Sequence, residues 1–408
     1  MSISPSALKH QIEAVQLFRL VQAGGDESED GDELRDMMLV SWEEMTDHER
    51  ELLRGLYRDL HMLSKDEVLD EEPATMDQFR VAWKSKDYTL VLHLLRKRRD
   101  PGLTDDKVAY IRGRAWGELG YREAALAFTT YAADASPHNG TYAYLALVDA
   151  IELDHVDEAL ARAAAIEARE DAPIRSFIAA AHALLRFAPD DDAARRFYER
   201  AAALLTRAIE TESARLPTEQ LPGLLAEAYI ELGICREMLG DVNGAHDSYS
   251  DALKVDPKND AALTARGLLL MNTDERAAER DFERAVQSGT PLVWPYLYLA
   301  PMYLGREEYR ACIQVCSAAF KHALDQGDEQ RANFYEWLAI ANRACRAPEP
   351  IVEDLFARAG ERAPLNLRID ENRRRQRDWE VVRDTSLEES RLRFREAHKW
   401  QSPLPAAA

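Results

Sequence analysis

Apolar residues recur along the chain at the spacing of an α-helix, in which residues three and four apart are neighbours. Five leucines in residues 51–63 fall on one side of such a helix: Leu52, Leu53, Leu56, Leu60 and Leu63. Related patterns predict helices over residues 6–21, 33–44 and 47–63, and Thr46 with Glu49 predicts a capping box for the third. Only 18 Gly and 17 Pro occur in 408 residues, too few turn residues for an architecture of strands. The chain is therefore predicted to be all-α.

Small residues and prolines repeat at fixed spacing in two distant stretches. In the first stretch the steps between successive positions are 7, 5, 7 and 5, at Gly233, Gly240, Ala245, Ala252 and Pro257. In the second stretch the same steps of 7, 5, 7 and 5 separate Gly113, Gly120, Ala125, Ala132 and Pro137. Five matching positions in the same order indicate an internal repeat.

The repeated residues predict an antiparallel pair of helices. Glycine inside a helix costs about 1 kcal/mol relative to alanine, so Gly233 is expected where a second helix approaches closely. Gly240 is placed to end the first helix in the left-handed conformation that glycine adopts easily. Ala245 and Ala252 give the second helix a narrow face for packing, and Pro257 ends it.

This stretch resembles a tetratricopeptide repeat (TPR), a helix–turn–helix unit of about 34 residues. The residues that match the family pattern are Tyr229, Leu232, Gly233, Gly240, Ala245, Tyr249, Ala252 and Pro257. Arg236 departs from the pattern, because that position is usually aromatic. Gly267 and Pro291 each lie 34 residues after their counterparts in the first copy, which supports the period.

Weaker copies extend the repeat in both directions. The resemblance implies an α–α superhelix, a TPR-like solenoid of about eight antiparallel helix pairs between residues 74 and 362. An unusually long second helix is expected over residues 190–215. The predicted domains are an acidic N-terminal helical cap (1–73), degenerate TPR-like pairs (74–215), a TPR array (216–362), and an Arg-rich C-terminal helix with a disordered tail (363–408). Residues 24–33, rich in acidic side chains, are predicted to be a mobile loop.

Charge and cysteine content narrow the choice of partners and compartments. The formal net charge of −21 disfavours nucleic acid and anionic membranes and favours cationic partners. No window of about 18 apolar residues and no signal peptide is recognisable, so a cytoplasmic location without membrane insertion is expected. The four cysteines are expected to be reduced core thiols. Cys312 and Cys316 share a helix face, but no further ligands with metal-site spacing accompany them, so no metal site is expected.

The resemblance also implies which residues face a partner. In TPR arrays the first helices line a concave groove, and four positions of each first helix usually face it. Carried onto this chain, the candidate groove residues are Lys107, Tyr110, Arg114, Glu227, Ile230, Ile234, Thr264, Leu268, Met271 and the neighbouring Tyr296. Packing between helices is the alternative role for Ile234, Leu268 and Met271. Glu227 and Glu231 replace the Lys and Asn with which the family holds chaperone C-termini, so that ligand is not expected.

No motif in the sequence indicates a reaction. Phosphate loops, dinucleotide-binding turns, zinc-protease helices and nucleophile elbows are all missing from the sequence, so neither enzymatic activity nor a cofactor is expected. The predicted function is a non-enzymatic adaptor or scaffold that binds a protein or peptide in its concave groove. Two alternatives remain: self-association through the acidic and Arg-rich ends, and RNA association through Arg373–Arg375 and Arg377. The identity of the partner and the oligomeric state stay open.

Overall fold

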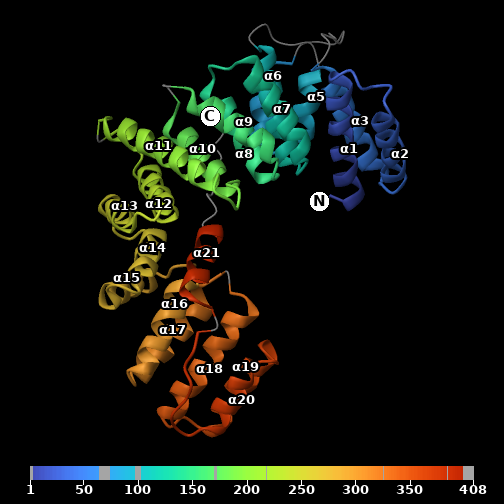
Figure 1. Cartoon of the computed structure of the whole chain (residues 1–408). Helices are drawn as coiled ribbons and strands as arrows, with labels where there is room; N and C mark the ends of the chain where they lie inside the picture. The colour runs from blue at the N-terminus through green and yellow to red at the C-terminus, as the bar shows by residue number, and fades with distance from the viewer. Residues whose placement is uncertain are drawn as a thin grey trace. The chain divides into compact units, whose positions relative to one another are not determined.

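The structure is a computed structural model that describes residues 3–63, 74–96, 103–169, 172–216, 218–324, 326–383 and 385–397. Every regular element within these ranges is a helix (Figure 1). Contacts between residues divide the chain into two compact units, unit 1 (residues 1–183) and unit 2 (residues 184–408). This division lies ahead of the boundary predicted at 215/216. The predicted all-α fold class is confirmed for the described residues.

Unit 1 begins with three helices and continues as helix pairs. Its helices are α1 (Pro5–Gln22), α2 (Glu29–Glu43), α3 (Asp47–His61), α4 (Met76–Lys84), α5 (Tyr88–Arg96), α6 (Asp105–Glu118), α7 (Arg122–Ala135), α8 (Gly140–Glu152) and α9 (Val156–Glu167). Helix α10 (Ile174–Arg186) crosses the division between the units.

Unit 2 continues the series and ends with two further helices. Its helices are α11 (Ala194–Ser213), α12 (Pro222–Met238), α13 (Val242–Val255), α14 (Asp260–Leu270), α15 (Glu275–Gln287), α16 (Trp294–Gly305), α17 (Tyr309–His322), α18 (Asp328–Ala344), α19 (Glu349–Arg362), α20 (Leu367–Arg374) and α21 (Leu387–Ala397). The sixteen described helices from α4 to α19 agree in number with the predicted series of about eight pairs. Contacts join the two helices in α4–α5, α6–α7, α8–α9, α12–α13, α14–α15, α16–α17 and α18–α19. The long helix expected over residues 190–215 is α11, with 20 residues.

The packing of α12 on α13 follows the predicted roles of the small residues. A Cβ atom on Gly233 would lie 2.3 Å from Cε1 of Tyr249, whose ring is fully buried. The same relation recurs in the next pair, where a Cβ atom on Gly267 would lie 2.5 Å from Cε1 of Phe282. Gly240 has a φ of +82°, the left-handed conformation expected at the end of the first helix. These contacts are why the TPR-like spacing produces close helix pairs.

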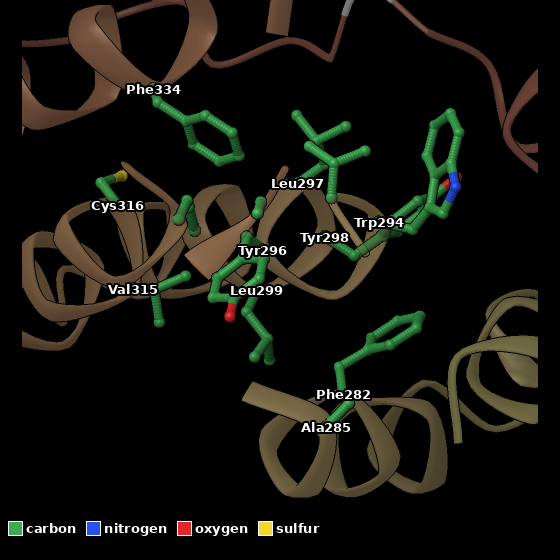
Figure 2. Close-up of a cluster of buried hydrophobic side chains, with 14 of the residues drawn as sticks. Phe282, Ala285, Trp294, Tyr296, Leu297, Tyr298, Leu299, Val315, Cys316 and Phe334 are labelled. Carbon is green, nitrogen blue, oxygen red and sulfur yellow. The ribbon is translucent and has the colours of Figure 1, made fainter. Parts of the chain in front are cut away.

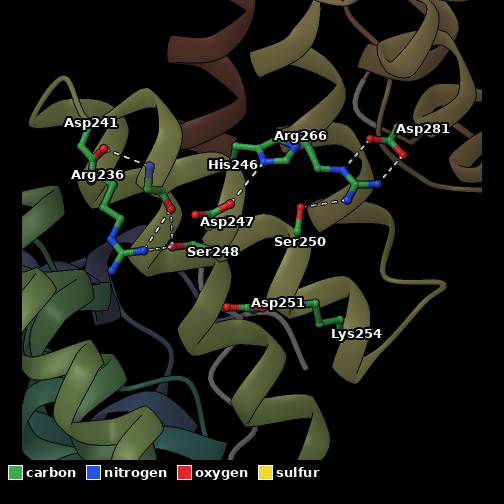
Figure 3. Close-up of polar contacts among 11 residues, drawn as sticks. Arg236, Asp241, His246, Asp247, Ser248, Ser250, Asp251, Lys254, Arg266 and Asp281 are labelled. Atoms are coloured by element: carbon green, nitrogen blue, oxygen red, sulfur yellow. Dashed lines mark hydrogen bonds and ion pairs between the residues drawn. The ribbon is translucent and has the colours of Figure 1, made fainter.

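Arg236 lies at the position where the repeat pattern usually has an aromatic residue. It makes polar contacts between α12 and α13. Its guanidinium donates hydrogen bonds to the carbonyl oxygen of Gly244 at 3.0 Å and to the Ser248 hydroxyl at 2.8 Å (Figure 3). In the following pair, Arg266 makes a two-point contact with Asp281 at 2.7 and 2.8 Å. Both arginines therefore join a first helix to its second helix.

Left-handed turns also occur in the weaker copies, which lack the turn glycine. Four non-glycine residues follow first helices with a positive φ: Lys86, Asp154, Glu307 and Arg346. Their φ values of 56° to 61° place them in the region that costs an L-residue free energy. The turn geometry is therefore retained where the sequence signal for it is gone.

Unit 2 has a continuous hydrophobic core with α16 at its centre. Tyr296, Tyr298 and Leu299 of α16 are buried beside Phe282 of the preceding pair and Phe334 of the following one (Figure 2). The rings of Phe282 and Tyr298 have centroids 5.4 Å apart, within the usual range for packed aromatic pairs. Helix α16 has 12 residues, with Pro295 in its first turn and Pro301 inside the helix.

Within unit 1, the N-terminal helices pack onto the helix pairs, as the predicted cap requires. Helix α1 contacts α7, and the Gln11 side-chain oxygen accepts a hydrogen bond from the Ala124 amide at 3.0 Å. The predicted capping box of Thr46 and Glu49 is present at the start of α3. The prediction that residues 24–33 form a loop was wrong for its second half, because α2 begins at Glu29. Ser28 caps this helix, and acidic residues in its first turn complement the helix dipole.

Candidate functional site

The predicted groove residues lie on the first helices of the pairs, and we call this surface of each unit its A face. In unit 2 the A face is formed by α12, α14, α16 and α18. Five of the predicted residues are buried there: Ile230, Ile234, Thr264, Leu268 and Tyr296. Glu227 of α12 and Met271, the residue that follows α14, are half-buried. Whether these residues bind a partner stays a prediction.

Packing explains part of this burial. The Thr264 hydroxyl donates a hydrogen bond to the Asp260 carbonyl of its own helix at 2.7 Å. The Tyr296 hydroxyl donates to the Thr290 carbonyl at 2.9 Å, so it braces the connection before α16. Ile230, Ile234 and Leu268 belong to the hydrophobic core of unit 2. Packing between neighbouring helices, the alternative role for Ile234 and Leu268, is therefore present.

A C-terminal segment lies on the A face of unit 2. We call residues 375–383 and 385–397 the strap; they belong to the segment 363–408 that was predicted to be an Arg-rich helix with a disordered tail. Its helix α21 contacts α14 and lies beside α14 and α16 (Figure 1). Phe394 is only 3% exposed and belongs to the core of unit 2, against which Trp379, Val381 and Leu387 also pack. The strap therefore carries apolar side chains that the A face buries, which was not predicted from the sequence.

Arg391 of the strap binds the end of a first helix. Its guanidinium donates hydrogen bonds to the carbonyl oxygens of Leu268 at 3.0 Å and Leu269 at 3.1 Å. These carbonyls lie in the last turn of α14, where helix carbonyls lack partners within the helix and carry the negative end of its dipole. A guanidinium at this point donates hydrogen bonds to the carbonyls and places a positive charge at the negative end of the dipole.

Two further arginines of the strap contact other first helices. Arg383 lies over the ring of Tyr298 in α16, 3.8 Å from the ring centroid, which is cation–π geometry. Burial raises the pKa of Tyr298, and the neighbouring Ser390 hydroxyl and the Arg383 and Arg391 guanidinium groups offset part of that rise. Arg395 contacts the sulfur of Met238, the last residue of α12. The strap therefore reaches three consecutive first helices.

Helix α20 anchors the beginning of the strap. Glu336 of α18 is completely buried and accepts hydrogen bonds from Arg368 at 2.7 Å and from the Asn372 amide at 2.8 Å. Asn372 in turn bonds both the backbone N–H and the carbonyl of Glu380. These contacts hold α20 and the first residues of the strap on α18.

The arginine run considered for RNA is partly paired within unit 2. Arg373 lies 2.6 Å from the Glu353 carboxylate, and Arg375 lies 3.4 Å from Glu371. Glu353 belongs to α19 and Glu371 to α20, so both ion pairs are formed within unit 2.

The A face of unit 1 carries the remaining predicted residues. Lys107 is exposed, and Tyr110 and Arg114 are half-buried on α6. The ring of Tyr110 packs against Tyr142 of α8, with centroids 5.1 Å apart. The structure therefore brings Tyr110 beside the next first helix, and it places Arg114 within 3.6 Å of Glu118.

Asp149 of α8 supplies a pH-dependent contribution to stability. Burial raises its pKa from 3.8 to about 6, although the Thr129 hydroxyl donates to the carboxylate at 2.8 Å. The folded state therefore binds more protons than the unfolded state between about pH 4 and 6, so stability falls as the pH rises through this window. At about 1.4 kcal/mol per pKa unit, the ionised group costs about 3 kcal/mol above pH 7.

We expect Asp149→Asn to raise the free energy of unfolding at pH 7.5 by about 3 kcal/mol and to leave it almost unchanged at pH 4. Urea unfolding of both proteins at the two pH values measures this difference. An equal effect at both values would show that Asp149 is not protonated in the folded state near pH 5.

The cysteines are mostly buried, as expected. Cys235, Cys312 and Cys316 are buried, and burial raises the pKa of the Cys235 and Cys316 thiols well above the usual value. Cys345, at the end of α18, is exposed, so the prediction of a core thiol was wrong there. Among the described residues no group of three or more His, Cys, Asp or Glu is arranged to hold a metal ion.

Sequence reasoning missed the strap, although a signal for it was present. Leu387, Arg391 and Phe394 are spaced four and three residues apart, the pattern of one helix face. The high charge of the surrounding residues hid this short apolar pattern.

No described helix combines the length and the apolar character that a bilayer-spanning helix requires.

Comparison with known proteins gives only a structural likeness. No protein-family model matches the chain, and no curated protein matches its sequence. A tetratricopeptide repeat protein from Parabacteroides merdae has a TM-score of 0.44 at 15% identity, over 65% of this chain and 96% of that one. Cut9 in the APC/C Cut9–Hcn1 assembly has a TM-score of 0.40 at 15% identity, over 87% and 64%. A thermophilic TPR protein from Thermus thermophilus has a TM-score of 0.35 at 18% identity, over 53% and 99%. The TPR-like fold of this chain stands on its own helix pairs, which pack through Gly233 and Gly267.

Proposed function

We propose that this chain is a non-enzymatic adaptor that binds a protein partner on its A faces. The observation that carries this proposal is the strap, a helical segment already seated on the A face of unit 2. That face accepts the helix through the buried ring of Phe394 and through the carbonyls bound by Arg391. A surface that binds a helix from its own chain has the features needed to bind one from another protein.

The test compares surface variants on the two sides of the helix pairs. Lys107→Glu and Met271→Glu change the A faces, whereas Lys254→Glu and the exposed Val242→Glu change a second helix, α13. Each full-length variant is immobilised, and proteins bound from cell extract are identified and then purified for affinity measurement. We expect the A-face variants to weaken the purified partner's affinity by about tenfold or more and the α13 variants to leave it unchanged.

Circular dichroism of each variant verifies that it is folded. Equal affinity of every folded variant for each purified partner would place binding elsewhere on the chain. Ile230 and Leu268 are unsuitable for this experiment, because they are buried and an arginine at either position would disrupt the core.

A further inference from the structure

The strap shows which side-chain chemistry the A face of unit 2 selects. The receptor groups that it meets are the last carbonyls of α14, the ring face of Tyr298 and the sulfur of Met238. Backbone carbonyls, aromatic ring faces and thioethers all attract a guanidinium, and none of them stabilises an anion. Glu329 of α18 adds a carboxylate 4.0 Å from Arg393. This surface therefore selects cationic ligands.

The spacing of the strap residues defines the ligand more closely. Arg391 and Arg395 are one helical turn apart, and the buried Phe394 lies between them in sequence. The opposite side of α21 is open, since Leu392 is half exposed. A matching ligand is an amphipathic helix with one aromatic anchor and arginines four residues apart, presented on the same side.

Helix α21 can leave the A face without disturbing α20. The buried Glu336 holds α20 through Arg368 and Asn372, and the last of these anchoring contacts is at Glu380. Among the described residues from Gln376 to Ser386 there is no helix, so this connection can act as a tether. A tethered segment competes at an effective concentration on the order of millimolar. Any ligand from another molecule must overcome this competition.

We infer that the A face of unit 2 is a receptor for an arginine-bearing amphipathic helix of a partner protein, and that α21 occupies it until such a helix displaces it. This inference rests on the proposed function and names the partner class for it. Release of α21 exposes the carbonyls of Leu268 and Leu269 to the incoming helix. The large negative net charge of the chain also favours an arginine-bearing helix, since it attracts cationic segments.

The experiment uses full-length protein and a synthetic peptide of residues 381–397 carrying a fluorescent label. Fluorescence anisotropy measures peptide binding to the wild type, to Arg391→Ala and to Arg391→Ala/Phe394→Ala. We expect the double variant to bind the peptide about tenfold or more tightly than the wild type, because its own α21 competes less well. A control peptide of the same length with Arg391→Glu should bind about tenfold or more weakly, because it places a carboxylate against carbonyls.

Thermal unfolding verifies that both variants are folded, and Arg391→Ala retains the Phe394 anchor if the double variant does not fold. Equal peptide affinity for all proteins, or no peptide binding to any, would overturn the inference. Capture of a partner through the A faces would still support the proposed function in that case. Light scattering supplies a separate check: a wild-type dimer that the double variant converts to a monomer would show that α21 is exchanged with a second copy, which also overturns it.

Discussion

Replacing Gly233 with alanine should lower the free energy of unfolding by about 2 kcal/mol, because overpacking a core costs about 1 to 3 kcal/mol. The position is at the upper end of that range, since the new Cβ would lie 2.3 to 2.8 Å from three ring carbons of Tyr249. That ring is fully buried, and its hydroxyl donates a hydrogen bond to Glu237 at 2.6 Å, so it cannot move freely. The higher helix propensity of alanine offsets about 1 kcal/mol of this overpacking cost.

Gly360 provides a matched control for this prediction. It lies inside α19, and a Cβ there would meet nothing within 4 Å. Gly360→Ala should therefore raise the free energy of unfolding by about 0.5 to 1 kcal/mol. Urea unfolding followed by circular dichroism compares both variants with the wild type. Stabilisation by both substitutions would mean that the close approach of α13 does not require a glycine.

The architecture was predictable because helix pairing depends on a few residues whose roles are local. Gly233 and Gly240 fix a close approach and a left-handed turn, and both constraints can be inferred from spacing alone. The same reasoning counted the later pairs correctly, even where Glu307 and Arg346 replace the turn glycine. Propensity and periodicity carry this information because they act within one or two helices.

The candidate site was less predictable because it depends on contacts between distant parts of the chain. Arg391 binds carbonyls of Leu268 and Leu269, more than 100 residues away in sequence, and backbone carbonyls leave no mark in a sequence. Burial of Ile230 follows from the packing of neighbouring helices, which repeat positions do not reveal. Spacing therefore identifies the A face, but it does not identify what covers that face.

Replacing Asp59 with alanine should lower the free energy of unfolding of unit 1 by about 3 to 5 kcal/mol, the usual cost of removing one partner from a buried ion pair. The Asp59 side chain is completely buried and accepts two hydrogen bonds from Arg96, at 2.8 and 2.7 Å. It also accepts one from the Trp116 indole at 3.2 Å and lies 3.6 Å from Nε of Arg112. The substitution removes this carboxylate from two largely buried arginines, Arg96 and Arg112. It also removes the contacts through which Asp59 joins α3 to α5 and α6.

Glu51, on the same helix, separates the effect of burial from that of charge. Its carboxylate lies 2.7 Å from Arg54, but both side chains are more than half exposed. Because exposed ion pairs contribute about 0 to 1 kcal/mol, Glu51→Ala should change stability little, although it removes the same charge. The two variants are compared by urea unfolding, with hydrogen exchange of amides in α3, α5 and α6 as the local measurement. Similar small losses for both would show that Arg96 finds solvent or another acceptor once Asp59 is gone. A large loss for Asp59→Ala alone, with faster exchange in all three helices, would establish that this one carboxylate joins the N-terminal cap to the first repeats.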